Sequence, residues 1–322
     1  MKLGVLTVIL SEPIDAALKY LSGLGVQAIE LGCGGYPGNK HCDPAALLAD
    51  EAKLKDFKSM VADSGMIISA LSCHGNPVHP NKELAKQFHA DFEAAVRLAE
   101  KLGLDTVITF SGCPGDFEGA KYPNWVTCPW PPDFLDILDY QWDGVLVPYW
   151  KKTAKFANDH GVTKIALEMH PGFCVYNPET LLKLRAAVDG KTIGANFDPS
   201  HLFWQGIDPA KAIKDLGPAI FHFHAKDSAV DSYNAASNGV LDTKHYTDEI
   251  NRSWIFRTVG YGHDMRVWRD IISALRLVGY DHVMSIEHED SLMSPKEGLE
   301  KAIYFLKQAM IFEAKPTEIS WA

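Results

Sequence analysis

The chain has 322 residues, of which 47% are hydrophobic and 22% are charged, and its formal net charge is −10. It is long enough to bury a large core, and residues 1–322 fit one domain, because a single α/β barrel needs roughly 250 residues. The acidic balance and the lack of a basic patch argue against nucleic-acid binding. No stretch approaches the roughly 20 apolar residues of a membrane span, so we expect a soluble, cytoplasmic protein without a membrane partner.

Short runs rich in β-branched and aromatic residues alternate with helical patterns in the first half of the chain. The predicted strands there are residues 3–7, 28–31, 67–72 and 106–111. A first helix is expected after Pro13, and further helices are expected at 51–64 and 82–102. His74 follows the third strand and is therefore a candidate for binding a substrate.

The same alternation continues in the second half of the chain. The predicted strands are residues 164–168, 193–198, 220–224 and 283–287, and the predicted helices include 145–160 and 295–313. Two connections are long, one after the fourth strand at 112–141 and one after the seventh at 228–264. The first is rich in aromatic residues and predicts a lid or an interface, unless it packs on itself. The second brings Trp254 and His263 as candidates for binding a substrate.

Four of the predicted strands end in residues that commonly bind metals. These are Glu168, Asp198, His224 and Glu287. Apolar runs bounded by Gly and Pro predict parallel strands that are buried on both faces. Closing eight such strands into a (β/α)₈ TIM barrel brings their carboxyl ends to one rim. Three carboxylates and one imidazole would suit Mn²⁺ best, with Mg²⁺ or Co²⁺ also possible. Alternatively, each side chain only caps a strand or pairs with Lys or Arg.

Further polar side chains stand close to these strand ends. His170 lies two residues beyond Glu168, so we expect it to lie beside the substrate and to take part in catalysis. Lys226 could neutralise an oxyanion in catalysis, or it could simply pair with Asp227.

Two more histidines and one glutamate belong to the same region. His201 is expected to contact the substrate or to hold a ligand carboxylate by a hydrogen bond. His222 should share the inward face of the seventh strand one layer below the predicted ligand, and is a further candidate for binding the substrate. For Glu30 a structural hydrogen-bonding role is favoured over a catalytic one.

The cysteines and the end of the chain carry weaker signals. Six cysteines without a CxxC pair predict reduced thiols. The stretch 314–322 carries Ile319 and Trp321, which suggests that it docks on a neighbour. Together with the aromatic loop this predicts a homo-oligomer, and a partner subunit remains an open alternative.

The series Glu168, Asp198-x-x-His201, His224-x-Lys226-Asp227 and Glu287 spans most of the chain, with Val259-Gly260-Tyr261-Gly262 before the last helix. It resembles the xylose isomerase-like TIM barrel superfamily of sugar phosphate isomerases and epimerases. The resemblance implies a divalent-metal-dependent isomerase or epimerase that acts on a small carbohydrate. The reaction would remove a proton next to a carbonyl and pass through an enediolate held by the metal ion. Glu168 and Glu287 would then serve both as metal ligands and as the proton-transfer pair.

Two other activities occur on the same scaffold. A metal-dependent lyase would begin with the same proton removal and then expel a β-substituent from a keto-sugar, such as a 3-keto-glycoside with a C- or O-linked group or an inosose. His170, His74 or His263 could supply the acid that this needs. A DNA-repair endonuclease is disfavoured, because Ser111 stands where an additional His ligand is expected and the chain is acidic. Ketose 3-epimerases of the superfamily carry an Arg where this chain has Val230, which predicts a different substrate.

Overall fold

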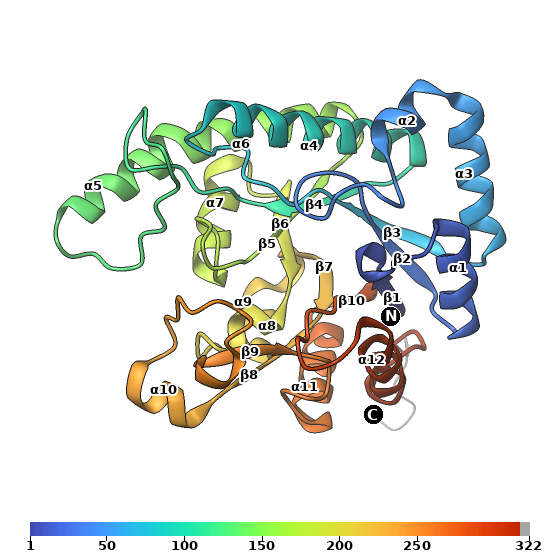
Figure 1. Ribbon diagram of the computed structural model, residues 1–322. Helices are drawn as coiled ribbons and strands as arrows, with labels where there is room; N and C mark the ends of the chain where they lie inside the picture. Colours follow the sequence, from blue (N-terminus) through green and yellow to red (C-terminus); the bar gives the residue numbers. More distant parts are fainter. Residues whose placement is uncertain (316–322) are drawn as a thin grey trace, which may run out of the picture.

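The computed structural model describes residues 1–315, so the predicted docking of Ile319 and Trp321 lies outside the described residues. Eight parallel strands form a closed barrel in the order β1-β10-β7-β6-β5-β4-β3-β2 (Figure 1). Their bounds are β1 Lys2–Leu6, β2 Ala28–Gly32, β3 Ile67–Ser72, β4 Thr106–Phe110, β5 Lys164–Glu168, β6 Ile193–Phe197, β7 Ile220–Ala225 and β10 Val283–Ile286. The predicted (β/α)₈ barrel is confirmed.

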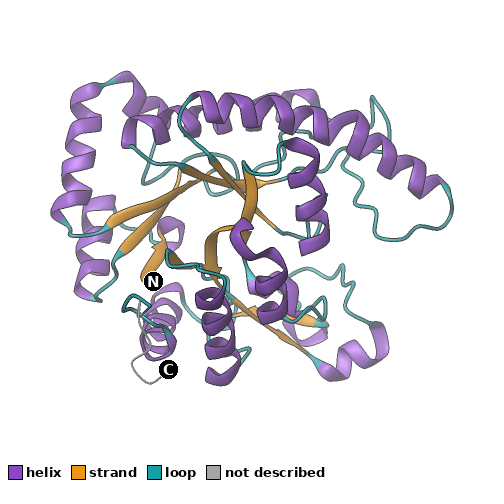
Figure 2. Ribbon diagram, turned by 180° about the vertical axis from the view of Figure 1, so that it is seen from behind, coloured by secondary structure: helices purple, strands orange, loops and turns teal. Residues whose placement is uncertain are grey.

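Helices surround the barrel on its outer side (Figure 2). The helices between and after the barrel strands are α1 Ile14–Gly23, α2 Pro44–Ala49, α3 Glu51–Asp63, α4 Lys82–Leu102, α6 Val147–Asp159, α7 Pro178–Val188, α8 Pro199–Phe203, α9 Pro209–Leu216, α11 Met265–Leu277 and α12 Pro295–Ala309. Helix α4 has the predicted bounds because its end signals are local. Asn81 accepts hydrogen bonds from the first turn, and Gly103 ends the helix in a left-handed conformation with φ 74°. None of the described helices is long and apolar enough to cross a lipid bilayer.

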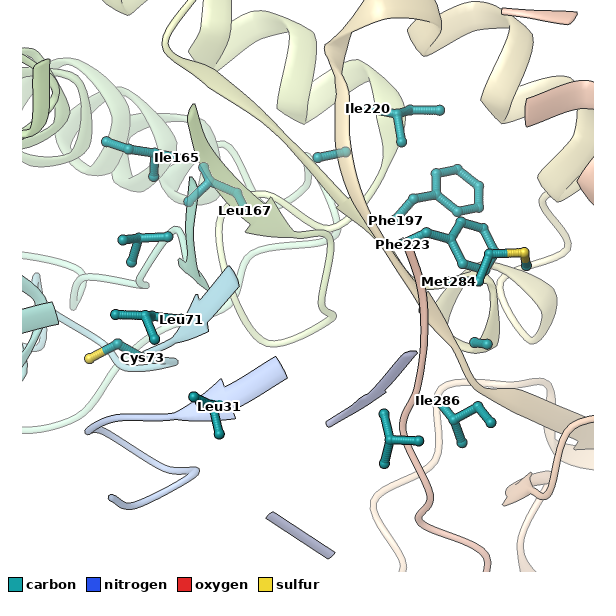
Figure 3. Packing of buried hydrophobic residues seen from close by; sticks show 14 of the residues in the cluster. Leu31, Leu71, Cys73, Ile165, Leu167, Phe197, Ile220, Phe223, Met284 and Ile286 are labelled. Carbon is teal, nitrogen blue, oxygen red and sulfur yellow. The ribbon is translucent and has the colours of Figure 1, made fainter. Parts of the chain in front are cut away.

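Alternate residues of each strand face the helices or the barrel interior. In β5, Ile165 and Leu167 point outward and pack in the main core, whereas Ala166 belongs to a separate small cluster inside the barrel (Figure 3). Phe221 closes that inner cluster, and Gly194 is needed there because a Cβ would stand 2.4 Å from the Phe221 ring. The same alternation points Glu168 inward at the end of β5.

Both long connections contain regular structure that the sequence patterns did not reveal. The first holds α5 Asp133–Asp139, followed by the π-helix Tyr140–Leu146. The second holds an antiparallel pair of strands, β8 Asp227–Val230 and β9 Trp254–Arg257, and between them α10 Ser232–Asn238. Helices α5 and α10 both project on the left side of the barrel in Figure 1.

Candidate metal centre

Four neighbouring strands of the barrel bring the predicted ligands together. Glu168 ends β5, Asp198 follows β6, His224 lies in β7 and Glu287 follows β10, and these strands are adjacent in the barrel order. One ligand atom from each of these four side chains lies within 4.8 Å of the others. The carboxyl ends of parallel strands share one rim, so side chains that are up to 119 positions apart (287 minus 168) meet at one point.

The donor atoms of this cluster fit a divalent cation. Asp198 Oδ2, His224 Nδ1 and Glu287 Oε2 are buried, yet within residues 1–315 none of them makes a hydrogen bond of acceptable geometry. His224 Nδ1 lies only 3.0 Å from Glu287 Oε2 and 3.2 Å from Glu168 Oε2, so these pairs are close without being well aligned. Buried polar atoms normally have partners. An ion among three oxygens and a ring nitrogen would satisfy all of them.

Asp198 shows how the backbone aims one ligand atom. Its Oδ1 accepts a hydrogen bond of 2.8 Å from Ser200 N at the start of α8, which leaves Oδ2 facing the cluster. Burial raises the pKa of Asp198 to about 6, although Lys226 opposes this shift. A bound cation would favour the ionised carboxylate in the same position.

Glu168 is held from several sides. His74 Nε2 and Asn196 Nδ2 lie 3.0 and 3.2 Å from its Oε2, and His201 Nε2 lies 3.1 Å from its Oε1. Burial alone would raise the pKa of Glu168, but the neighbouring imidazoles of His201, His224 and His74 outweigh it and hold the pKa well below its usual range. The carboxylate is therefore ionised and fixed in orientation.

His224 is oriented from beneath by Glu30. The His224 Nε2 atom lies 2.9 and 3.0 Å from the two carboxylate oxygens of Glu30, and both residues are fully buried. If Nε2 donates its proton to Glu30, the Nδ1 lone pair faces the cluster. Burial would raise the pKa of Glu30, but His224 and His222 lower it to about 2. Glu30 thus lies where it can form a structural hydrogen bond, the role that the sequence analysis favoured over a catalytic one. That role stays a prediction.

Lys226 lies among the carboxylates of the rim. Its Nζ is 3.1 Å from Asp198 Oδ2, 2.9 Å from Glu287 Oε2 and 3.1 Å from Glu289 Oε2. Burial would lower the pKa of Lys226, but the surrounding carboxylates raise it well above its usual range. The side chain is buried, so it brings a fixed positive charge to the site. Lys226 thus pairs with these carboxylates and not with Asp227, which was the simpler alternative predicted from the sequence.

A hollow of about 340 Å³ opens above the cluster and includes Glu168, Glu287, Lys226, His74 and His170 among its lining residues. Asp198 and His224 are not among its lining residues, so the two glutamates are the cluster members that face the space. Burial lowers the pKa of His170 to about 3. Its Nδ1 is 2.5 Å from Pro171 O, which places a proton on Nδ1 and leaves Nε2 with a lone pair.

Four of the five predicted substrate-binding residues, His201, His222, His263 and Trp254, do not line this hollow. His222 is fully buried beneath it, and its ring nitrogens lie 3.1 Å from Asn196 Oδ1 and Ser69 Oγ, so both nitrogens are already used. The ring of His263 stacks on Phe203, and its Nδ1 contacts Asp227. Trp254 lines a second hollow with His201. Neither His222 nor His263 lines this hollow, and their binding of a substrate stays a prediction.

The sequence patterns did not single out some residues that complete the site. Glu289 and Phe110 line the hollow, and Asn196 connects Glu168 with His222. Glu289 had a usable signal, since it is two residues beyond Glu287. Phe110 is an apolar residue at a strand end, and its side chain gives no signal that separates it from a core residue.

The fold and the site together define the class of this protein: it is a closed (β/α)₈ barrel in which three carboxylates and an imidazole converge at one rim. Residues 18–309 match the model of the xylose isomerase-like TIM barrel family, and the chain belongs to this family. It is 42% identical to the uncharacterized protein YfiH of Bacillus subtilis (strain 168) over 313 residues, which are 96% of this chain and 99% of YfiH.

Solved structures agree on the fold. The IOLI protein with a bound zinc atom has a TM-score of 0.65 and 19% identity, with 96% of each chain covered. The 3-keto-D-glucoside 4-epimerase YcjR from E. coli has a TM-score of 0.64 and 13% identity, with 96% of this chain and 99% of YcjR covered. At this level of identity the likeness concerns the fold alone.

Proposed function

We propose that the protein is a divalent-metal-dependent isomerase or epimerase of sugars, which removes a proton next to a carbonyl group. The observation that carries this proposal is the cluster of Glu168, Asp198, His224 and Glu287, with three buried donor atoms that lack a well-aligned partner. The epimerase activity in the name of YcjR and the zinc bound to the IOLI protein support it as properties of relatives in fold.

The cluster would hold one ion through Glu168, Asp198, His224 and Glu287. Three oxygens and one nitrogen favour Mn²⁺, with Mg²⁺ or Co²⁺ as alternatives. When bound, the ion would polarise the carbonyl of the substrate and so lower the barrier to loss of the neighbouring proton. The protein's part is to orient the substrate and to move that proton.

Glu168 and Glu287 are placed to move the proton. Both line the hollow, and they come from β5 and from the end of β10, with β6 and β7 between them in the barrel. A sugar between these strands would therefore meet one carboxylate on each side. One carboxylate would take the proton to form an enediolate, and the other would return a proton to the same or the neighbouring carbon.

Other side chains of the hollow would hold and stabilise the substrate. Lys226 brings a buried ammonium group that could stabilise developing negative charge on a substrate oxygen. His74 lines the hollow and contacts Glu168, so it would orient that carboxylate and contact the sugar. His201 acts on Glu168 from the other side.

A lyase is the second candidate, and the position of His170 favours it. His170 lines both the hollow over the cluster and the second, aromatic hollow. Its Nε2 has a lone pair, so it could take up a proton and pass it to a leaving group. A keto-glycoside or an inosose would be suitable substrates, because both carry a leaving group β to the acidic carbon.

The two candidates are separated by NMR in D₂O with added Mn²⁺, using free ketoses, inososes and keto-glycosides in parallel. Deuterium next to the carbonyl of an intact, rearranged sugar would support the isomerase or epimerase. Loss of water or an aglycone would establish the lyase. Glu168→Gln and Glu287→Gln should abolish both signals, whereas the matched control Glu83→Gln, at an exposed residue in the first turn of α4, should retain the turnover. Full turnover in both cluster variants would contradict the proposal.

A further inference from the structure

A second hollow, which we call the aromatic hollow, lies beside the metal centre. It has a volume of about 280 Å³, and its walls include Trp125, Trp204, Trp254, Tyr246 and Leu241. Trp125 comes from the connection after β4, and Tyr246 and Trp254 come from the connection after β7. The two long insertions thus face one another across a space that the metal cluster itself does not need.

The aromatic side chains form a flat and rigid wall. The rings of Trp204 and Trp254 are stacked with an interplanar angle of 3° and centroids 4.7 Å apart. Trp254 Nε1 donates a hydrogen bond of 3.1 Å to Val240 O, and the buried guanidinium of Arg252 lies 4.7 Å from the Trp254 ring centroid. Because these rings are already fixed, a planar ligand would bind there at little entropic cost.

The charge of the aromatic hollow also limits the ligand. Asp242 is its one acidic lining residue, and that carboxylate is already occupied by Lys244 Nζ at 2.8 Å and by Ser253 N at 2.7 Å. A ligand rich in hydroxyl groups would find few free acceptors there. The lining therefore favours an uncharged, flat, apolar ring over a second sugar.

The aromatic hollow adjoins the space above the metal centre. His170 lines both hollows, and its ring centroid is 4.1 Å from that of His201, whose Nε2 lies 3.1 Å from Glu168. A further hollow of about 400 Å³ shares Tyr246 with the aromatic hollow and Glu289 with the space above the cluster. The three hollows therefore meet around His170, which is the arrangement that a ligand reaching from Glu168 to the aromatic wall would need.

We propose that the substrate is an aryl keto-glycoside, with the keto-sugar at the metal centre and the aromatic ring in the aromatic hollow. The inference rests on the proposed function for the position of the sugar. His170 then stands at the junction of the two parts. This explains the two long insertions, which a free ketose would not use.

The test is a binding measurement by calorimetry on the Mn²⁺-loaded protein, comparing p-nitrophenyl β-D-glucoside with methyl β-D-glucoside. We expect the aryl glucoside to bind at least about tenfold more tightly, because aromatic stacking adds to the burial of apolar area. Tyr246→Ala should remove most of this preference, and this variant should fold because Tyr246 is half exposed. Trp254→Phe should keep part of the preference, while the control Trp130→Ala, at a residue 73% exposed and outside the hollow, should keep all of it.

Equal affinities for the two glucosides, no binding of either, or an aryl preference that Tyr246→Ala leaves intact would overturn the inference. The proposed function fails by a different readout, because it predicts solvent exchange at a carbon of the sugar. Exchange on free ketoses without an aryl preference would refute the aromatic site alone. An aryl preference that Tyr246→Ala removes, without any exchange or elimination, would refute the proposed function and leave the aromatic site standing.

Discussion

Replacing Asp227 should destabilise the fold strongly, because this carboxylate is the centre of a buried hydrogen-bond network. Asp227 begins β8 and is fully buried. Its Oδ2 accepts hydrogen bonds of 3.0–3.2 Å from Gly260 N, Gly262 N, His263 N and Trp268 Nε1. Its Oδ1 accepts from Ser228 N at 2.9 Å and contacts His263 Nδ1 at 2.8 Å. The backbone is shaped around it, since a Cβ on Gly262 would stand 2.5 Å from Asp227 Oδ1.

The size of the effect follows from the donors left without a partner. A hydrogen bond to a charged group contributes about 1.5–3 kcal/mol, and an orphaned buried donor costs about 1–3 kcal/mol. Asp227→Ala removes all six contacts, but water can reach some of the part-buried N–H groups and the losses do not add fully. We expect the free energy of unfolding to fall by about 4 kcal/mol. Asp227→Asn keeps the shape and one carbonyl oxygen, so we expect a loss of about 2 kcal/mol.

The assay is urea unfolding followed by tryptophan fluorescence and circular dichroism, with EDTA present so that metal binding does not contribute. The matched control is Asp231→Ala, which removes only the cap of α10 and should cost about 1 kcal/mol. If Asp227→Ala lay within 1 kcal/mol of the control, or if the Asn and Ala variants were equally stable, the network would not have the importance assigned to it.

Four further outcomes follow from the metal centre. Glu30→Gln should weaken Mn²⁺ binding about 10–100-fold in calorimetry, because Glu30 orients His224, and unchanged affinity would contradict this. Burial raises the pKa of Asp198 to about 6, and this carboxyl must lose its proton to bind the ion. Mn²⁺ affinity should therefore fall about tenfold per pH unit below pH 6, and an affinity that does not change between pH 7 and pH 5 would contradict this. In the metal-free protein, the same carboxyl keeps its proton up to about pH 6 when folded but loses it near pH 4 when unfolded. The contribution of Asp198 to the free energy of unfolding is therefore smaller at pH 6 than at pH 4, and urea midpoints at the two pH values measure this direction. Lys226→Ala should lower turnover by roughly 100-fold or more without loss of the fold, and unchanged kinetics would remove its role on a substrate oxygen.

The barrel and the cluster could be predicted because both depend on local patterns. Each barrel strand is a short apolar run bounded by turn residues, and the closed topology then places every strand end on one rim. Glu168 and Glu287 could both be predicted as ligands because each stands at the end of such an apolar run. No pairing between them had to be known in advance.

The remaining features depend on tertiary contacts that leave little trace in the sequence. Strand periodicity placed His222 on the inward face but could not say that Asn196 and Ser69 already occupy its ring nitrogens. His263 is turned toward Asp227 by a loop whose shape follows from that carboxylate. The pairing of β8 with β9 joins segments separated by α10, so no local turn signal marks it.

The most direct test of the account is a crystal structure of the protein grown with Mn²⁺, with anomalous diffraction measured on both sides of the manganese absorption edge. The account predicts one manganese peak bound by Glu168, Asp198, His224 and Glu287, and its loss in Glu168→Gln. A peak elsewhere, or none in this cluster at saturating Mn²⁺, would contradict the metal centre and the chemistry built on it.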